Sequence, residues 1–109
     1  MSDPVPAVSV SDLPADAPML DVRELDEWTA GHAPHARHLP MSELAGRMGE
    51  VPTDDPLYVV CRSGGRSARV VAYLAQQGFP AVNVEGGMQD WAAQGRTVVT
   101  DDGSAPRIA

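Results

Sequence analysis

Short apolar runs alternate with helix-like segments along most of this chain. The continuous run Leu57–Val60 is typical of a strand buried on both faces. The segment that follows it, up to Gly78, has apolar residues at helical spacing. Strands that alternate with helices form parallel sheets, because a helix carries the chain back to the start of the next strand. The sequence therefore predicts an α/β fold with a parallel sheet.

The same pattern predicts the other elements and the limits of the domain. Further strands are expected at 7–10, 19–23, 36–39 and 81–84, and helices at 24–32, 41–50, 66–77 and 87–94. With 109 residues the chain has the length of one small domain, expected at 5–99. Residues 100–109 are polar and small, and we expect them to form a disordered tail.

Composition excludes several classes of function. The net charge is −7, which disfavours a general nucleic-acid binder. No apolar run approaches the roughly 18 residues that a membrane helix needs, and the first residues do not resemble a signal peptide. Cys61 is the only cysteine, so no disulfide forms within the chain. These features predict a cytoplasmic protein that binds neither nucleic acid nor membrane.

Positive charge gathers in one part of this acidic chain. Between Pro56 and Val84 there is no Asp or Glu, but there are three arginines, Arg62, Arg66 and Arg69. A local positive region of this kind is either an anion-binding site or a basic, solvated helix face. Charge patterning alone does not choose between these two interpretations.

The loop after Leu57–Val60 favours one of these interpretations, because it begins with Cys61 and continues "RSGGR". Glycines allow successive backbone N–H groups to turn toward one point, and the following helix adds unpaired N–H groups at its start. Together with two arginines, these groups favour the thiolate and can hold a small oxyanion beside it. The alternative is an inert buried cysteine, but two charged arginines beside it would then need water or partners. We therefore favour an activated nucleophile.

Three stretches of the chain resemble the rhodanese family. "CRSGGRS" resembles the active-site loop of that family, "MLDVRELDEWTAGHAPHARHLPMSEL" resembles its first signature, and "VNVEGGMQDWAAQGRTV" resembles its C-terminal one. Together they cover about residues 5–99, which is nearly the whole chain. The resemblance implies a doubly wound fold with a five-stranded, mostly parallel sheet and helices on both faces.

The resemblance also implies sulfur transfer. Cys61 matches the catalytic cysteine, which carries a sulfane sulfur as a persulfide, so no other cofactor is expected. The substrate-binding loop would consist of Arg62, Ser63, Gly64, Gly65 and Arg66. Loops rich in arginine are associated with thiosulfate, a small anionic donor, and two arginines suit such a dianion. Without a second cysteine, the sulfur must pass to an external acceptor, such as cyanide, a thiol or a protein thiolate.

Two other functions stay open. A cysteine phosphatase uses a similar anion cradle, but its arginine follows the cysteine by six residues, whereas Arg66 follows Cys61 by five. The shorter ring suits a sulfur atom better than a tetrahedral phosphate. A binding or sulfur-relay module that has kept the fold without turnover is the other alternative.

Several residues outside the loop are candidates for supporting roles. Asp21 ends a predicted strand at the same sheet edge as Cys61, and we expect it to orient an arginine. Arg23 is expected to form an ion pair with Glu24 or Glu27. A metal site is not expected in "HAPHARH", because Pro34 interrupts the helical spacing of the three histidines and no cysteine or acid joins them.

Overall fold

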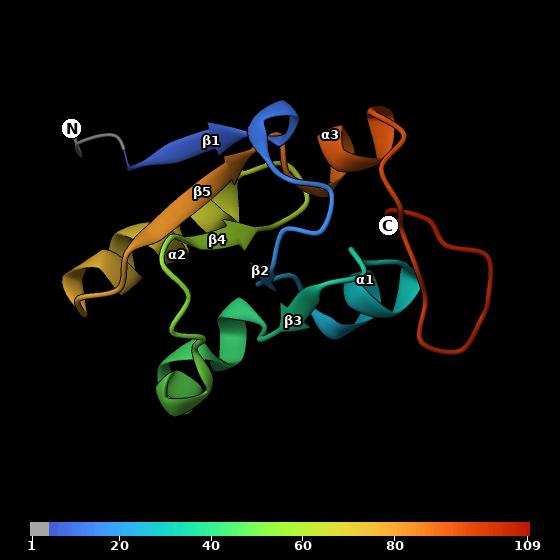
Figure 1. Ribbon diagram of the computed structural model, residues 1–109. Coiled ribbons are helices and arrows are strands. Elements are labelled where there is room, and N and C mark those ends of the chain that lie inside the picture. The colour runs from blue at the N-terminus through green and yellow to red at the C-terminus, as the bar shows by residue number, and fades with distance from the viewer. Residues whose placement is uncertain (1–4) are drawn as a thin grey trace.

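The described part of the molecule, residues 5–109 of a computed structural model, contains one five-stranded sheet (Figure 1). Its spatial order is β1-β5-β4-β2-β3, and every neighbouring pair is parallel. The strands are β1 (Ala7–Ser9), β2 (Met19–Asp21), β3 (Ala36–His38), β4 (Leu57–Val60) and β5 (Ala81–Glu85). The predicted α/β fold with a parallel sheet is confirmed. The central position of β4 places Cys61 in the middle of the carboxyl edge of the sheet.

Helices cover both faces of this sheet, as predicted. They are α1 (Leu25–Ala30), α2 (Gly65–Gln76) and α3 (Gly87–Ala93), with two 3-10 helices, η1 (Val10–Asp12) and η2 (Met41–Glu50). Side chains of β4 alternate between two apolar clusters. Val59 and Cys61 belong to the cluster that contains Val71 of α2. Val60 belongs to the cluster that contains Trp91 of α3.

The segment 41–50 differs from the α-helix that the sequence predicts. It forms the 3-10 helix η2, which is broken at Arg47, where φ is −129°. Gly46 and Gly49 lower the helix propensity on both sides of this residue. Only Leu44 of this segment is buried, so little packing energy opposes the break.

The C-terminal segment, for which the sequence predicts disorder over residues 100–109, returns to the region of α1 (Figure 1). The backbones of His32 and Val99 exchange hydrogen bonds of 2.9 and 2.8 Å. The Arg107 N–H donates to the Ala30 carbonyl at 2.9 Å. Asp101 accepts hydrogen bonds from Trp28 Nε1 and His32 Nε2 at 3.3 and 2.9 Å. In this structure the segment therefore has defined contacts with residues 28–32, and its disorder stays a prediction.

Within residues 5–109, none of the helices has the length and apolar character that crossing a bilayer requires.

Candidate active site

Cys61 lies directly after β4, where the chain turns into α2. Its residue exposure is 1%, and its side chain belongs to the α2 side of the core. Arg62, Ser63 and Gly65 are exposed above it, whereas Gly64 is buried. The exposed residues next to the buried sulfur are thus among those that the resemblance assigns to substrate binding.

The sulfur atom receives two hydrogen bonds from its own loop and helix. The Gly64 N–H lies 3.1 Å from Cys61 Sγ, and Ser67 Oγ lies 3.3 Å from it. Burial raises the pKa of the Cys61 thiol, but hydrogen bonds from the Ser67 hydroxyl and from nearby backbone N–H groups outweigh it. The pKa of Cys61 is therefore lower than that of an ordinary thiol.

Two glycines allow the backbone to close around this sulfur. Gly64 has a φ of +106°, which a residue with a side chain rarely adopts, and this conformation turns its N–H toward Sγ. Gly87, at the start of α3, lies so close that a Cβ there would collide with the carbonyls of Cys61 and Arg62. The same two carbonyls accept hydrogen bonds from Met88 and Gln89 N–H at 2.8 and 2.9 Å. The start of α3 thus holds the loop in place.

A buried polar pair supports the donors to the sulfur. Ser67 Oγ lies within hydrogen-bond distance of Asn83 Oδ1, and Asn83 Nδ2 donates to the Gly64 carbonyl at 3.2 Å. Asn83 is 6% exposed and Ser67 is 0% exposed. Sequence reasoning missed both residues as site residues. The sequence feature that could have indicated them is the asparagine inside "AVNV". A side-chain amide in a buried strand needs hydrogen-bond partners, because burying it without them costs free energy.

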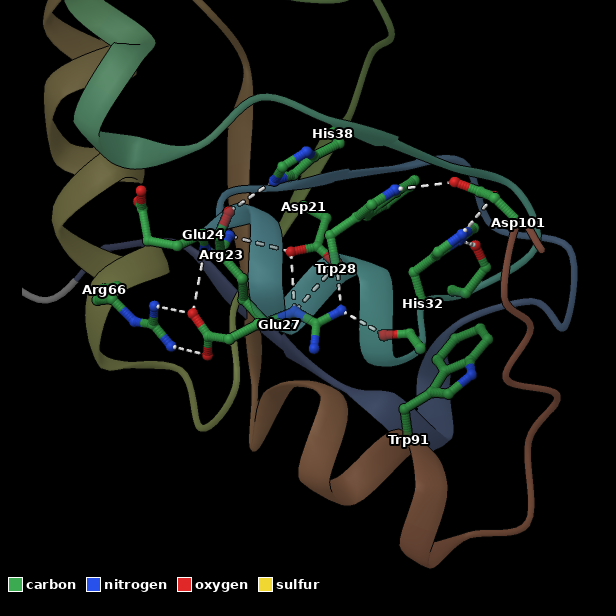
Figure 2. Close-up of polar contacts among 12 residues, drawn as sticks. Asp21, Arg23, Glu24, Glu27, Trp28, His32, His38, Arg66, Trp91 and Asp101 are labelled. Atoms are coloured by element: carbon green, nitrogen blue, oxygen red, sulfur yellow. Dashed lines mark hydrogen bonds and ion pairs between the residues drawn. The ribbon is translucent and has the colours of Figure 1, made fainter. Parts of the chain in front are cut away.

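The two loop arginines have different surroundings. Arg62 is exposed, and among residues 5–109 it takes part in no ion pair. Arg66 pairs with Glu27 of α1 through two parallel hydrogen bonds of 2.7 Å (Figure 2). This hydrogen bonding by Arg66 holds the pKa of Glu27 below its usual value. Sequence reasoning did not foresee this acid beside the loop.

Asp21 and Arg23 form a separate, fully buried ion pair. Arg23 Nη2 lies 2.8 Å from Asp21 Oδ2 and donates to the Gly31 carbonyl at 2.7 Å, and Arg23 Nε also reaches the carboxylate (Figure 2). The prediction that Arg23 pairs with Glu24 or Glu27 is wrong, because the Arg23 side chain reaches back to the carboxylate of Asp21, the last residue of β2. Asp21 therefore holds Arg23, and an orienting role toward the reaction stays a prediction.

The three histidines do not gather with acids into a metal-binding group. Among residues 5–109 no three His, Cys, Asp or Glu side chains lie close enough to hold an ion. Trp28 stacks on His32 at a ring distance of 3.6 Å and on His38 at 4.9 Å. His38 Nε2 lies 2.7 Å from the Arg23 carbonyl. Two of the histidines thus serve in packing, and the lack of a metal cofactor stays a prediction.

The chain is similar in sequence and fold to known proteins. Residues 7–94 match the family described as the rhodanese-like domain. A sulfurtransferase of Allochromatium vinosum is 40% identical over 89 residues, which cover 81% of this chain and 83% of that protein. A Bacillus subtilis protein with the name sulfur carrier protein YrkF is 39% identical over 70% of this chain, which is 42% of that protein. A rhodanese-related protein of Thermoplasma volcanium is similar in structure, with a TM-score of 0.80 and 34% identity over 88% of this chain and 99% of that one.

Proposed function

Because the chain belongs to the rhodanese-like domain family, we propose that it is a sulfurtransferase whose Cys61 carries a persulfide between a small anionic donor and an external acceptor. The observation that supports this proposal best is the pair of donors, Gly64 N–H and Ser67 Oγ, that meet at Sγ. Donors in this position stabilise a thiolate before the reaction and the negative persulfide after it.

The proposed reaction is a nucleophilic displacement at sulfur. With thiosulfate, the Cys61 thiolate attacks the outer sulfur, a new S–S bond forms, and the electron pair of the broken bond leaves with sulfite. The thiolate and the dianion together become an anionic persulfide and the sulfite dianion, so charge is balanced. An acceptor nucleophile then attacks the outer sulfur of the persulfide and restores the Cys61 thiolate. Cyanide, a thiol or a protein thiolate can fill this role.

A sulfur-relay role is the second candidate, and it uses the same chemistry up to the persulfide. The relative that has the name of a sulfur carrier favours it. In a relay the loaded Cys61 delivers its sulfur only to one partner protein, so small acceptors would discharge it slowly.

A phosphatase role is disfavoured by the geometry of the loop. In a phosphate cradle the arginine donates two parallel hydrogen bonds to the phosphate. Here both terminal nitrogens of Arg66 donate to Glu27 instead. Arg66 also follows Cys61 by five residues, one fewer than in that class.

Mass spectrometry of the intact protein tests the proposal. Reduced protein incubated with thiosulfate should gain the mass of one sulfur atom, and cyanide should remove it. Cys61→Ala should gain none. Absence of the adduct with any sulfane donor would overturn the proposed function, and discharge by a protein acceptor but not by cyanide would favour the relay role.

A further inference from the structure

The ion pair between Arg66 and Glu27 joins the active-site loop to α1. It is bidentate, and the two side chains are only 27% and 15% exposed. Glu27 is also fixed by its own helix, because its Oε1 accepts the Glu24 N–H at 3.1 Å in a capping box. A bidentate, partly buried pair with a fixed partner is a stable arrangement. Arg66 therefore stays paired in the resting site (Figure 2).

The pair changes the charge that an incoming donor meets. Arg66 and Glu27 form a pair with no net charge, so of the two loop arginines only exposed Arg62 is left to offset the charge of an ionised Cys61. The ionised site is thus close to neutral, although its loop sequence has two arginines and no acid. The whole chain carries −7, which repels anions further, and a dianion more than a monoanion.

We infer that Glu27 is a specificity-determining residue, which neutralises Arg66 and so selects against dianionic sulfane donors in favour of donors with one negative charge. This inference rests on the proposed function, and it names the class of donor. The donor loses its sulfane sulfur to Cys61, and its leaving group departs with the electron pair of the broken S–S bond. A singly charged donor adds less repulsion to the approach of the thiolate than thiosulfate does.

The alternative is that the pair only holds α1 against α2. A purely structural pair would affect all donors alike, since its loss would displace the loop whatever the donor's charge. A charge-selective role would change the ratio between donors. The ratio of the activities with a dianionic and a monoanionic donor therefore separates the two explanations, whereas the activity with one donor does not.

Thiosulfate and methanethiosulfonate form a matched pair of probes. Both present the same outer sulfur on a sulfonyl-type sulfur, but thiosulfate carries two negative charges and methanethiosulfonate carries one. Their leaving groups are sulfite and methanesulfinate, so charge is balanced in both reactions. The measurement is kcat/KM for each donor at one ionic strength, with cyanide as the acceptor.

Glu27→Gln should shift the ratio of kcat/KM, thiosulfate over methanethiosulfonate, about tenfold toward thiosulfate, as expected for one unit charge acting over about 12 Å at an effective dielectric constant of about 20. Gln retains the capping box, so α1 should keep its start. Glu27→Asp keeps the charge and should leave the ratio within about twofold of wild type. Glu43→Gln removes the same charge from the exposed pair with Arg47 and should leave the ratio unchanged.

A second variant covers the case in which Glu27→Gln does not fold. Arg66→Gln leaves the Glu27 carboxylate unpaired, so the ratio should move in the opposite direction, away from thiosulfate. An unchanged ratio in Glu27→Gln, with equal losses for both donors, would overturn the inference and leave the proposed function intact. If neither donor loads Cys61 in the wild-type protein, the proposed function itself fails, and the inference fails with it.

Discussion

Replacement of Ser67 by alanine tests the origin of the reactive thiol. The Ser67 hydroxyl has one proton and three acceptors within reach, namely Cys61 Sγ at 3.3 Å, the Gly64 carbonyl at 3.2 Å and Asn83 Oδ1. When the sulfur is ionised, it is the acceptor with a full charge. The proton should then turn toward Sγ, and the bond becomes charge-assisted.

The size of the effect follows from this competition. A hydrogen bond to a charged group contributes about 1.5–3 kcal/mol. The S···O distance is long and the proton leaves Asn83 to reach Sγ, so we expect the lower end of this range. Ser67→Ala should therefore raise the pKa of Cys61. At a pH below the wild-type pKa, the thiolate fraction of the variant should be about tenfold lower than that of wild type. The rate of alkylation by iodoacetamide reports this fraction directly.

The same variant has a separate effect on stability. Alanine leaves Asn83 Oδ1 buried without its donor, which costs about 1–3 kcal/mol in the free energy of unfolding. Ser11→Ala removes an exposed hydroxyl that bonds Gln94 and is the control for both measurements. A destabilised Ser67→Ala protein whose alkylation rate equals that of wild type would refute the role of Ser67 at the sulfur.

Three further changes test the site and its support. Because the pKa of Cys61 is lowered in the folded state, the unfolded chain binds more protons between that pKa and the usual thiol value of about 8.5. The free energy of unfolding of the reduced protein should therefore rise with pH through this window, and in Cys61→Ala it should rise less. Urea titrations at several pH values measure this dependence. The same dependence on pH in both proteins would contradict the lowered pKa. Gly87→Ala, at a φ of +56°, should lower the free energy of unfolding by at least about 1–3 kcal/mol and slow sulfur transfer. Gly46→Ala, where a Cβ meets open space, should do neither. Equal unfolding midpoints for the two variants would contradict the close packing of α3. Asp21→Asn leaves the Arg23 charge buried without its counter-ion and should cost about 3–5 kcal/mol in urea unfolding, and a loss below about 1 kcal/mol would show that the pair is not a buried charge pair.

The unit that carries the chemistry was predictable because its signals are local. The apolar run Leu57–Val60 coincides with β4, and α2 begins at Gly65, next to the predicted start. The glycine needed at position 64 is visible in the sequence, since a positive φ there depends on the residue itself. The order of strand, loop and helix then places Cys61 at a carboxyl edge.

The partners of the site residues were not predictable in the same way. Glu27 and Arg66 are 39 residues apart, and Ser67 and Asn83 are 16 apart. Their contacts depend on the sheet order, which sets β5 on one side of β4 and β2, with α1 after it, on the other. Several acids near Glu27 could have met an arginine, and the sequence expectation chose the wrong arginine.

The sequence by itself therefore determined the strand, the loop and the nucleophile, because periodicity and backbone freedom act between near neighbours. The tertiary structure alone decided which acid neutralises Arg66 beside Cys61. Charge interacts through space, so the charge of the site depends on which acid the fold brings to Arg66, and no local pattern encodes that distance.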